Sequence, residues 1–211
     1  MLTAILRSVL VVALYAGGAA QAAYVAYLYP QGANVVATGS GSFNKAGLTF
    51  VNQAGTIARI QPAVSTLGIG GTPNVFVPAD AYTGVTPPPN FGAGPNRDAD
   101  ATSGPALIIL NGLVGIPVGS QSGAALGTST ATWNNSTLAS LGAAVGTYVW
   151  TWGTGANADT FTLIVSASQP PPPTAASNVA SIPTLSEWGV IIMAALLGGF
   201  GLIATQRKRR S

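Results

Sequence analysis

The residue types that carry most enzyme chemistry are scarce in this chain of 211 residues. It has no Cys and no His, and its 8 Lys or Arg and 5 Asp or Glu make up only 6% of the residues. Soluble globular proteins usually carry about 25% charged residues. The composition excludes a thiolate nucleophile, a disulfide, a Ser-His-Asp triad and an imidazole metal ligand. We therefore expect no catalytic residue, no metal and no cofactor, and we predict that the protein is not an enzyme.

The remaining candidates for acid–base or metal chemistry are four Asp residues in the central part of the chain. No spacing in the sequence brings two of them together as the carboxylate pair that glycoside cleavage requires. Four residues alternate in the manner of a calcium-binding loop: Asn96, Asp98, Asp100 and Thr102. However, Ala101 takes the place of the required Gly, and Leu107 takes the place of the bidentate Glu. The pattern favours a solvated loop over a metal site.

An aromatic stripe is the other candidate site. In the alternating segment Thr147–Trp152, the side chains of Tyr148, Trp150 and Trp152 share one face of a predicted strand. Aromatic rings on one face are most often the buried side of a strand. The alternative is a platform on which the sugar rings of an extracellular polysaccharide stack.

The elements that must position these residues are predicted to be β-strands. Residues 23–165 contain short runs of β-favouring residues separated by Gly, Pro, Ser and Asn, which is typical of an all-β domain. The predicted strands are Tyr24–Tyr29, Asn34–Ser40, Leu48–Asn52, Thr56–Ile60, Asn74–Val77, Ala106–Leu110, Ala131–Trp133, Thr147–Trp152 and Thr160–Val165. We expect a long surface loop over Thr83–Gly104 and a single helical turn over Ser136–Gly142. The sequence predicts an antiparallel sandwich or a barrel-like single domain.

The positive charge of the chain lies at its ends. Residues 23–165 hold three cations (Lys45, Arg59 and Arg97) against four Asp, which gives 3 − 4 = −1. The net charge of +3 therefore comes from the termini. A central region with so few cations has no basic stripe for phosphates, and we expect no nucleic-acid partner.

The N-terminus has the order of a secretory signal peptide. Arg7 precedes an apolar core at Ser8–Tyr15, and small residues follow at Ala20 and Ala22. We predict a signal helix that signal peptidase removes by cutting after Ala22. The alternative is an uncleaved membrane anchor, although the apolar core is shorter than the ~20 residues that a span needs.

The C-terminal part begins with a linker and ends with a membrane segment. Residues 166–181 are rich in Pro and Ser, and Pro170–Pro173 favour an extended polyproline II spacer. Residues 188–204 are uncharged and predict a transmembrane helix of about 26 Å. A basic stop-transfer cluster follows and is expected to stay in the cytoplasm: Arg207, Lys208, Arg209 and Arg210.

This tail carries a family resemblance. A motif precedes the apolar helix and the basic end: Ile182, Pro183, Thr184 and Leu185, with Trp188 and Gly189 at the expected offset. This arrangement resembles the IPTL-CTERM protein-sorting signal and is similar in layout to that of short PEP-CTERM exported proteins of Gram-negative bacteria. The likeness covers residues 182–211. It implies that an exosortase-type membrane enzyme recognises the tail, attacks at the motif, and passes the protein outward.

The sequence thus predicts an exported protein of the cell envelope. The membrane anchors it transiently, and its destination is the outer surface or the extracellular matrix. We expect a structural or interaction role there. The alternative is a polysaccharide-binding module that uses the aromatic strand face, and a hydrolase is a third and weaker interpretation. The tail has an alternative too, as a plain anchor that is never processed.

Overall fold

A computed structural model describes residues 23–170, and all of its strands lie between Ala23 and Val165. The predicted signal helix (1–22) and transmembrane helix (188–204) lie outside the described residues. Thirteen strands form two sheets, which confirms the expected all-β class. Within residues 23–170, no helix is long and apolar enough to cross a membrane.

The six-stranded sheet places the first and last strands side by side in its interior. In spatial order it consists of β12 (Gly146–Trp152), β13 (Asp159–Val165), β1 (Ala23–Gln31), β2 (Asn34–Gly41), β11 (Ser129–Trp133) and β8 (Ala101–Ser103). All neighbours pair antiparallel except β1 and β13, which run parallel with Tyr24 opposite Phe161. The expectation of purely antiparallel pairing is wrong at this pair. A parallel pair needs a long crossover, and the whole intervening domain provides it.

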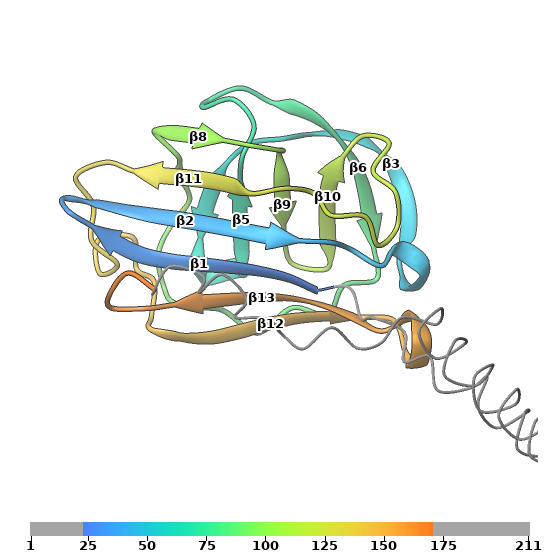
Figure 1. Cartoon of the computed structure of the whole chain (residues 1–211). Coiled ribbons are helices and arrows are strands. Elements are labelled where there is room, and N and C mark those ends of the chain that lie inside the picture. Colours follow the sequence, from blue (N-terminus) through green and yellow to red (C-terminus); the bar gives the residue numbers. More distant parts are fainter. Residues whose placement is uncertain (1–22, 171–211) are drawn as a thin grey trace, which may run out of the picture. The chain divides into compact units, whose positions relative to one another are not determined.

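The seven-stranded sheet forms the second layer. In spatial order it consists of β3 (Thr49–Thr56), β6 (Val77–Thr83), β10 (Leu113–Pro117), β9 (Leu107–Ile109), β5 (Thr66–Ile69), β4 (Arg59–Gln61) and β7 (Arg97–Asp98). Its strands run crosswise behind those of the first sheet, with β3 at one edge (Figure 1). The domain is therefore a β-sandwich with crossed sheets.

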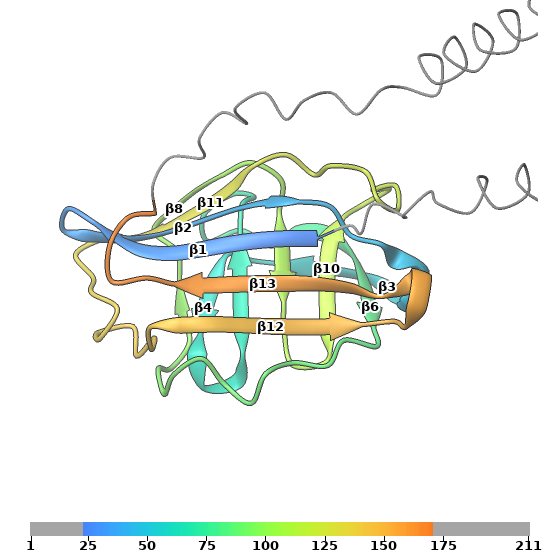
Figure 2. The same ribbon diagram turned by 60° about the horizontal axis from the view of Figure 1, so that its bottom comes forward.

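One side of the sandwich is closed by the backbone. The chain leaves β7 of one sheet and enters β8 of the other within a few residues. Between them the Ala99 amide donates to the Ala58 carbonyl, and the Asp100 amide donates to the Thr132 carbonyl at 2.8 Å. The strands of the two layers keep their crosswise arrangement when the molecule is turned (Figure 2). This corner connects the two sheets on one side of the sandwich.

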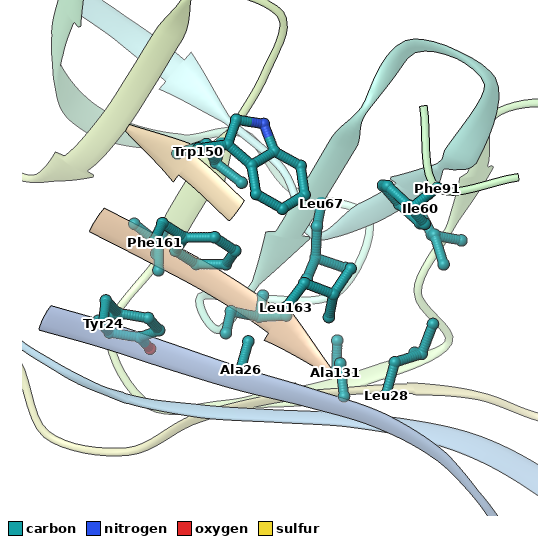
Figure 3. Close-up of a cluster of buried hydrophobic side chains, with 14 of the residues drawn as sticks. Tyr24, Ala26, Leu28, Ile60, Leu67, Phe91, Ala131, Trp150, Phe161 and Leu163 are labelled. Atoms are coloured by element: carbon teal, nitrogen blue, oxygen red, sulfur yellow. The ribbon is translucent and has the colours of Figure 1, made fainter. Parts of the chain in front are cut away.

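The hydrophobic core lies between the sheets. Side chains from β1, β12 and β13 point towards those of β4 and β5, as Figure 3 shows for Trp150, Phe161 and Leu67. A stack of four rings crosses the core. Ring centroids are 5.3 to 5.5 Å apart along the series Trp152, Phe43, Tyr24 and Phe161. Such offset aromatic pairs add to the hydrophobic gain of burial.

Most of the predicted strands match the structure. Seven predicted strands coincide with or overlap β1, β2, β3, β9, β11, β12 and β13. The segment Thr56–Ile60 is not one strand, because Ile57 and Ala58 separate β3 from β4. Asn74–Val77 is mostly a turn, and positive φ at Asn74 (56°) explains the break. The structure adds β5, β6 and β10, which the sequence did not predict.

The two predicted irregular segments have different outcomes. Thr83–Gly104 is not only a surface loop, since it contains β7 and β8 and places Phe91 in the core. The predicted turn near Ser136–Gly142 is present: the Leu141 amide donates to the Thr137 carbonyl, one helical turn back. Gly142 ends this turn with a positive φ of 64°, as helix-terminating glycines do.

Candidate functional site

The aromatic stripe is part of the core. Trp150 is 0% exposed and Trp152 is 3% exposed, whereas Tyr148 is half-buried. Trp150 packs edge-to-face against Phe161 and Phe91, with centroids 5.3 and 6.1 Å away. The sugar-stacking interpretation is therefore wrong for the two indoles, because neither has a ring face at the surface. Trp150 and Trp152 lie on the side of β12 that faces the opposite sheet, and large apolar side chains on such a face are usually buried.

The Asn96–Thr102 segment is not a loop, since it contains β7 and the start of β8, and its two Asp residues form ion pairs. Asp98 Oδ1 lies 3.7 Å from Arg59 Nε, and Asp100 Oδ2 lies 3.5 Å from Arg97 Nη2. The second Asp100 contact is the Asn134 amide, which donates at 2.7 Å. Within residues 23–170, no three His, Cys, Asp or Glu side chains gather as metal ligands would. These contacts indicate a structural role for the segment, as the corner between the two sheets.

The other two carboxylates also bind neighbouring groups. Asp80 accepts from the Gln53 side chain at 3.1 Å and from the Gly119 amide at 3.0 Å. The Asp159 carboxylate accepts hydrogen bonds from the backbone amide of Asn44 at 2.6 Å and from the backbone amide of its neighbour Thr160 at 2.7 Å. Burial raises the pKa of Asp159, and these two amides oppose the shift. Both carboxylates thus connect segments that are distant in the sequence, and Asp159 also binds the amide of the next residue in its own strand.

The structure reveals a surface that the sequence analysis missed. Strand β3 is exposed at seven of its eight residues, and Phe50 and Val51 are each 53% exposed. An apolar hollow of about 170 Å³ lies beside it, lined by residues that include Val51, Ala81, Ile108, Leu113 and Gly115. A second hollow is lined by Gln53, Ala54, Gly55, Phe76 and Pro78. We call β3 and these two hollows the β3 surface.

Small residues create the first of these hollows, the one of about 170 Å³. Gly115 and Ala81 are paired neighbours on β10 and β6, and Gly115 lies beside Ile108 on β9. A Cβ atom at Gly115 would come within 3.0 Å of the Ile108 side chain. The outer face of the sheet is therefore recessed at Gly115 and Ala81, and the side chains of Val51 and Leu113 project around this recess. The lack of charge in Thr49–Thr56 was the only sequence signal for this surface.

The predicted processing sites lie outside the described residues. These are the signal-peptide cleavage site at Ala20 and Ala22, the motif beginning at Ile182, and the basic cluster Arg207–Arg210. Residues 180–210 match the IPTL-CTERM motif family. The match confirms the resemblance seen in the sequence, and it identifies a C-terminal sorting signal of exported, envelope-associated proteins. No curated protein and no solved structure matches this chain.

Proposed function

We propose that this protein is a non-enzymatic structural or interaction protein of the cell envelope, processed at its C-terminal tail by an exosortase-type membrane enzyme. The single observation that carries the proposal is the match of residues 180–210 to the IPTL-CTERM motif. In this reading, the apolar segment 188–204 holds the chain in the membrane until the enzyme acts at the motif. The basic cluster Arg207–Arg210 keeps the far end in the cytoplasm.

The contacts of the folded domain support a structural role. Each of the four Asp carboxylates in the described region is engaged by a guanidinium, an amide or a side-chain donor. A group held in this way is poorly placed to exchange protons with a substrate. The interior between the sheets is filled by large aromatic and aliphatic side chains. These features favour a rigid module that presents its surface over one that encloses a substrate.

The test is the intact mass of the protein isolated from the producing cells. We expect wild-type protein to lack residues 1–22 and the segment beyond the motif. The variant Pro183→Ala should keep its tail and remain in the membrane fraction, because a proline disfavours helix and favours the extended backbone that a protease-like cleft binds. Thr174→Ala in the linker is the matched control and should be processed like wild type. Full retention of residues 182–211 in wild type would contradict the proposal and leave a plain anchor.

A further inference from the structure

Strand β3 is a long edge that other described elements leave open. It ends the seven-stranded sheet, so its outer row of amides and carbonyls pairs with no strand in residues 23–170. The other sheet edges are shorter or partly covered: β7 and β8 have two and three residues. At β12, Thr86 and Thr151 exchange backbone hydrogen bonds of 2.8 and 3.0 Å. An open edge strand is a template for pairing with another strand.

Charge restricts the kind of partner that fits. The sequence of β3, Thr-Phe-Val-Asn-Gln-Ala-Gly-Thr, contains no ionisable side chain. The nearest charged groups bind within the domain: Asp80 accepts from Gln53, and Lys45 donates to Tyr82 at 3.3 Å. The two Arg–Asp pairs lie on or next to β4 and β7, at the opposite edge of the sheet. A charged polymer would find nothing to bind here, whereas two uncharged β3 edges do not repel each other.

We infer that β3 is the docking strand for a second copy of this chain. Two β3 strands related by a two-fold axis pair antiparallel and join the seven-stranded sheets of both copies into one. Such an interface is self-complementary, because each copy contributes the same strand and the same uncharged side chains. At about 3.3 Å per residue, the eight residues provide an edge of roughly 26 Å. This inference rests on the proposed structural role and names the partner of its surface.

The apolar side chains of β3 add to the backbone pairing. Phe50 and Val51 are half exposed in the single copy and become partly buried when a second strand lies beside them. The register shift between Phe50 and Asn52 marks a β-bulge. Regular pairing is therefore expected over Asn52–Thr56, beyond the bulge.

Disulfide trapping tests this inference on the full-length chain in its producing cells. The chain has no Cys, so each variant carries a single thiol: Asn52→Cys, Gln53→Cys or Ala54→Cys. Residues at a two-fold axis between antiparallel strands have Cα atoms about 4.5–5.5 Å apart, which a disulfide can bridge. We expect a covalent dimer at one of these three positions. Val149→Cys, on the edge strand β12 and 39% exposed, is the control and should stay monomeric.

Light scattering of the purified protein provides the second measurement. Wild type should dimerise with rising concentration, and Val51→Lys should weaken the dimer at least tenfold because it places a charge from each copy in the interface. Val118→Lys, exposed on a loop, is the matched control and should dimerise like wild type. A monomeric wild type, or equal trapping at Val149 and β3, would overturn the inference. A processed, exported monomer refutes only the dimer, whereas a dimer with an unprocessed tail refutes only the proposed function.

Discussion

Replacement of Trp150 by Ala measures how much the buried aromatic stripe stabilises the domain. The indole is 0% exposed and makes edge-to-face contacts with Phe161 and Phe91. Truncation of a fully buried Trp typically destabilises a protein by about 3–5 kcal/mol. Part of this loss comes from the two aromatic pairs, which contribute about 0.5–1.5 kcal/mol each. The indole nitrogen makes no hydrogen bond within the described residues, so its removal leaves no donor or acceptor unpaired.

Urea unfolding followed by far-UV circular dichroism is the assay. With a denaturant dependence of about 2 kcal/mol per molar urea, the midpoint should fall by roughly 2 M. Val149→Ala is the matched control, because Val149 is the adjacent residue on the exposed face of the same strand. It should lower the stability by less than about 1 kcal/mol. Equal stability of the two variants would refute the assignment of Trp150 to the core and reopen the sugar-stacking interpretation.

Two further predictions concern ionisation and backbone conformation. Burial raises the pKa of Tyr24 from 10.0 to about 12, and the nearby Ser129 hydroxyl acts weakly in the opposite direction. As the pH rises above 10, the unfolded chain therefore loses the phenolic proton first. The Tyr24 phenol therefore contributes about 2–3 kcal/mol to the free energy of unfolding below pH 10, and this contribution is lost as the pH rises towards 12. Tyr24→Phe should show a shallower fall in thermal midpoint over this window, and an identical fall would contradict the shift. Gly142→Ala should destabilise the domain by at least about 2 kcal/mol more than Gly119→Ala in urea unfolding. Both glycines have positive φ, but a Cβ at Gly142 would lie 2.4 Å from the Gly94 backbone, whereas at Gly119 it meets nothing within 4 Å. Similar losses for the two variants would show that crowding at Gly94 is not the cause.

Several of the predicted strands, such as β11 and β13, are those in which local alternation agrees with burial. In β13 every second residue is buried, from Asp159 to Val165, and the apolar residues Phe161, Leu163 and Val165 occupy three of these positions. The missed strands break this rule. Strand β5 contains Gly68, which is needed because a Cβ there would lie 2.5 Å from the Ile57 carbonyl. Strand β10 contains Gly115 and ends at Pro117, residues that resemble turn signals in isolation. Their β conformation depends on neighbouring strands that are distant in the sequence.

The candidate sites divide in a similar way. The sorting signal could be identified from the sequence because its parts are contiguous: a motif, an apolar segment and a basic end. The aromatic stripe could be placed on one strand face, but the choice between core and surface required the position of the second sheet. The β3 surface could not be predicted, since Thr49–Thr56 becomes an edge only through the order of strands in the sheet.

The sequence by itself identified the C-terminal sorting signal of an exported, envelope-associated protein and the low charge of its central domain, because composition and contiguous motifs are local properties of the chain. Only the tertiary structure decided which faces are covered. It buried Trp150 and Trp152 between the sheets, and among residues 23–170 it left the outer edge of β3 without a partner strand. The physical reason is that burial depends on the packing of strands far apart in the chain. Strand β1, for example, lies beside β13 and not only beside β2.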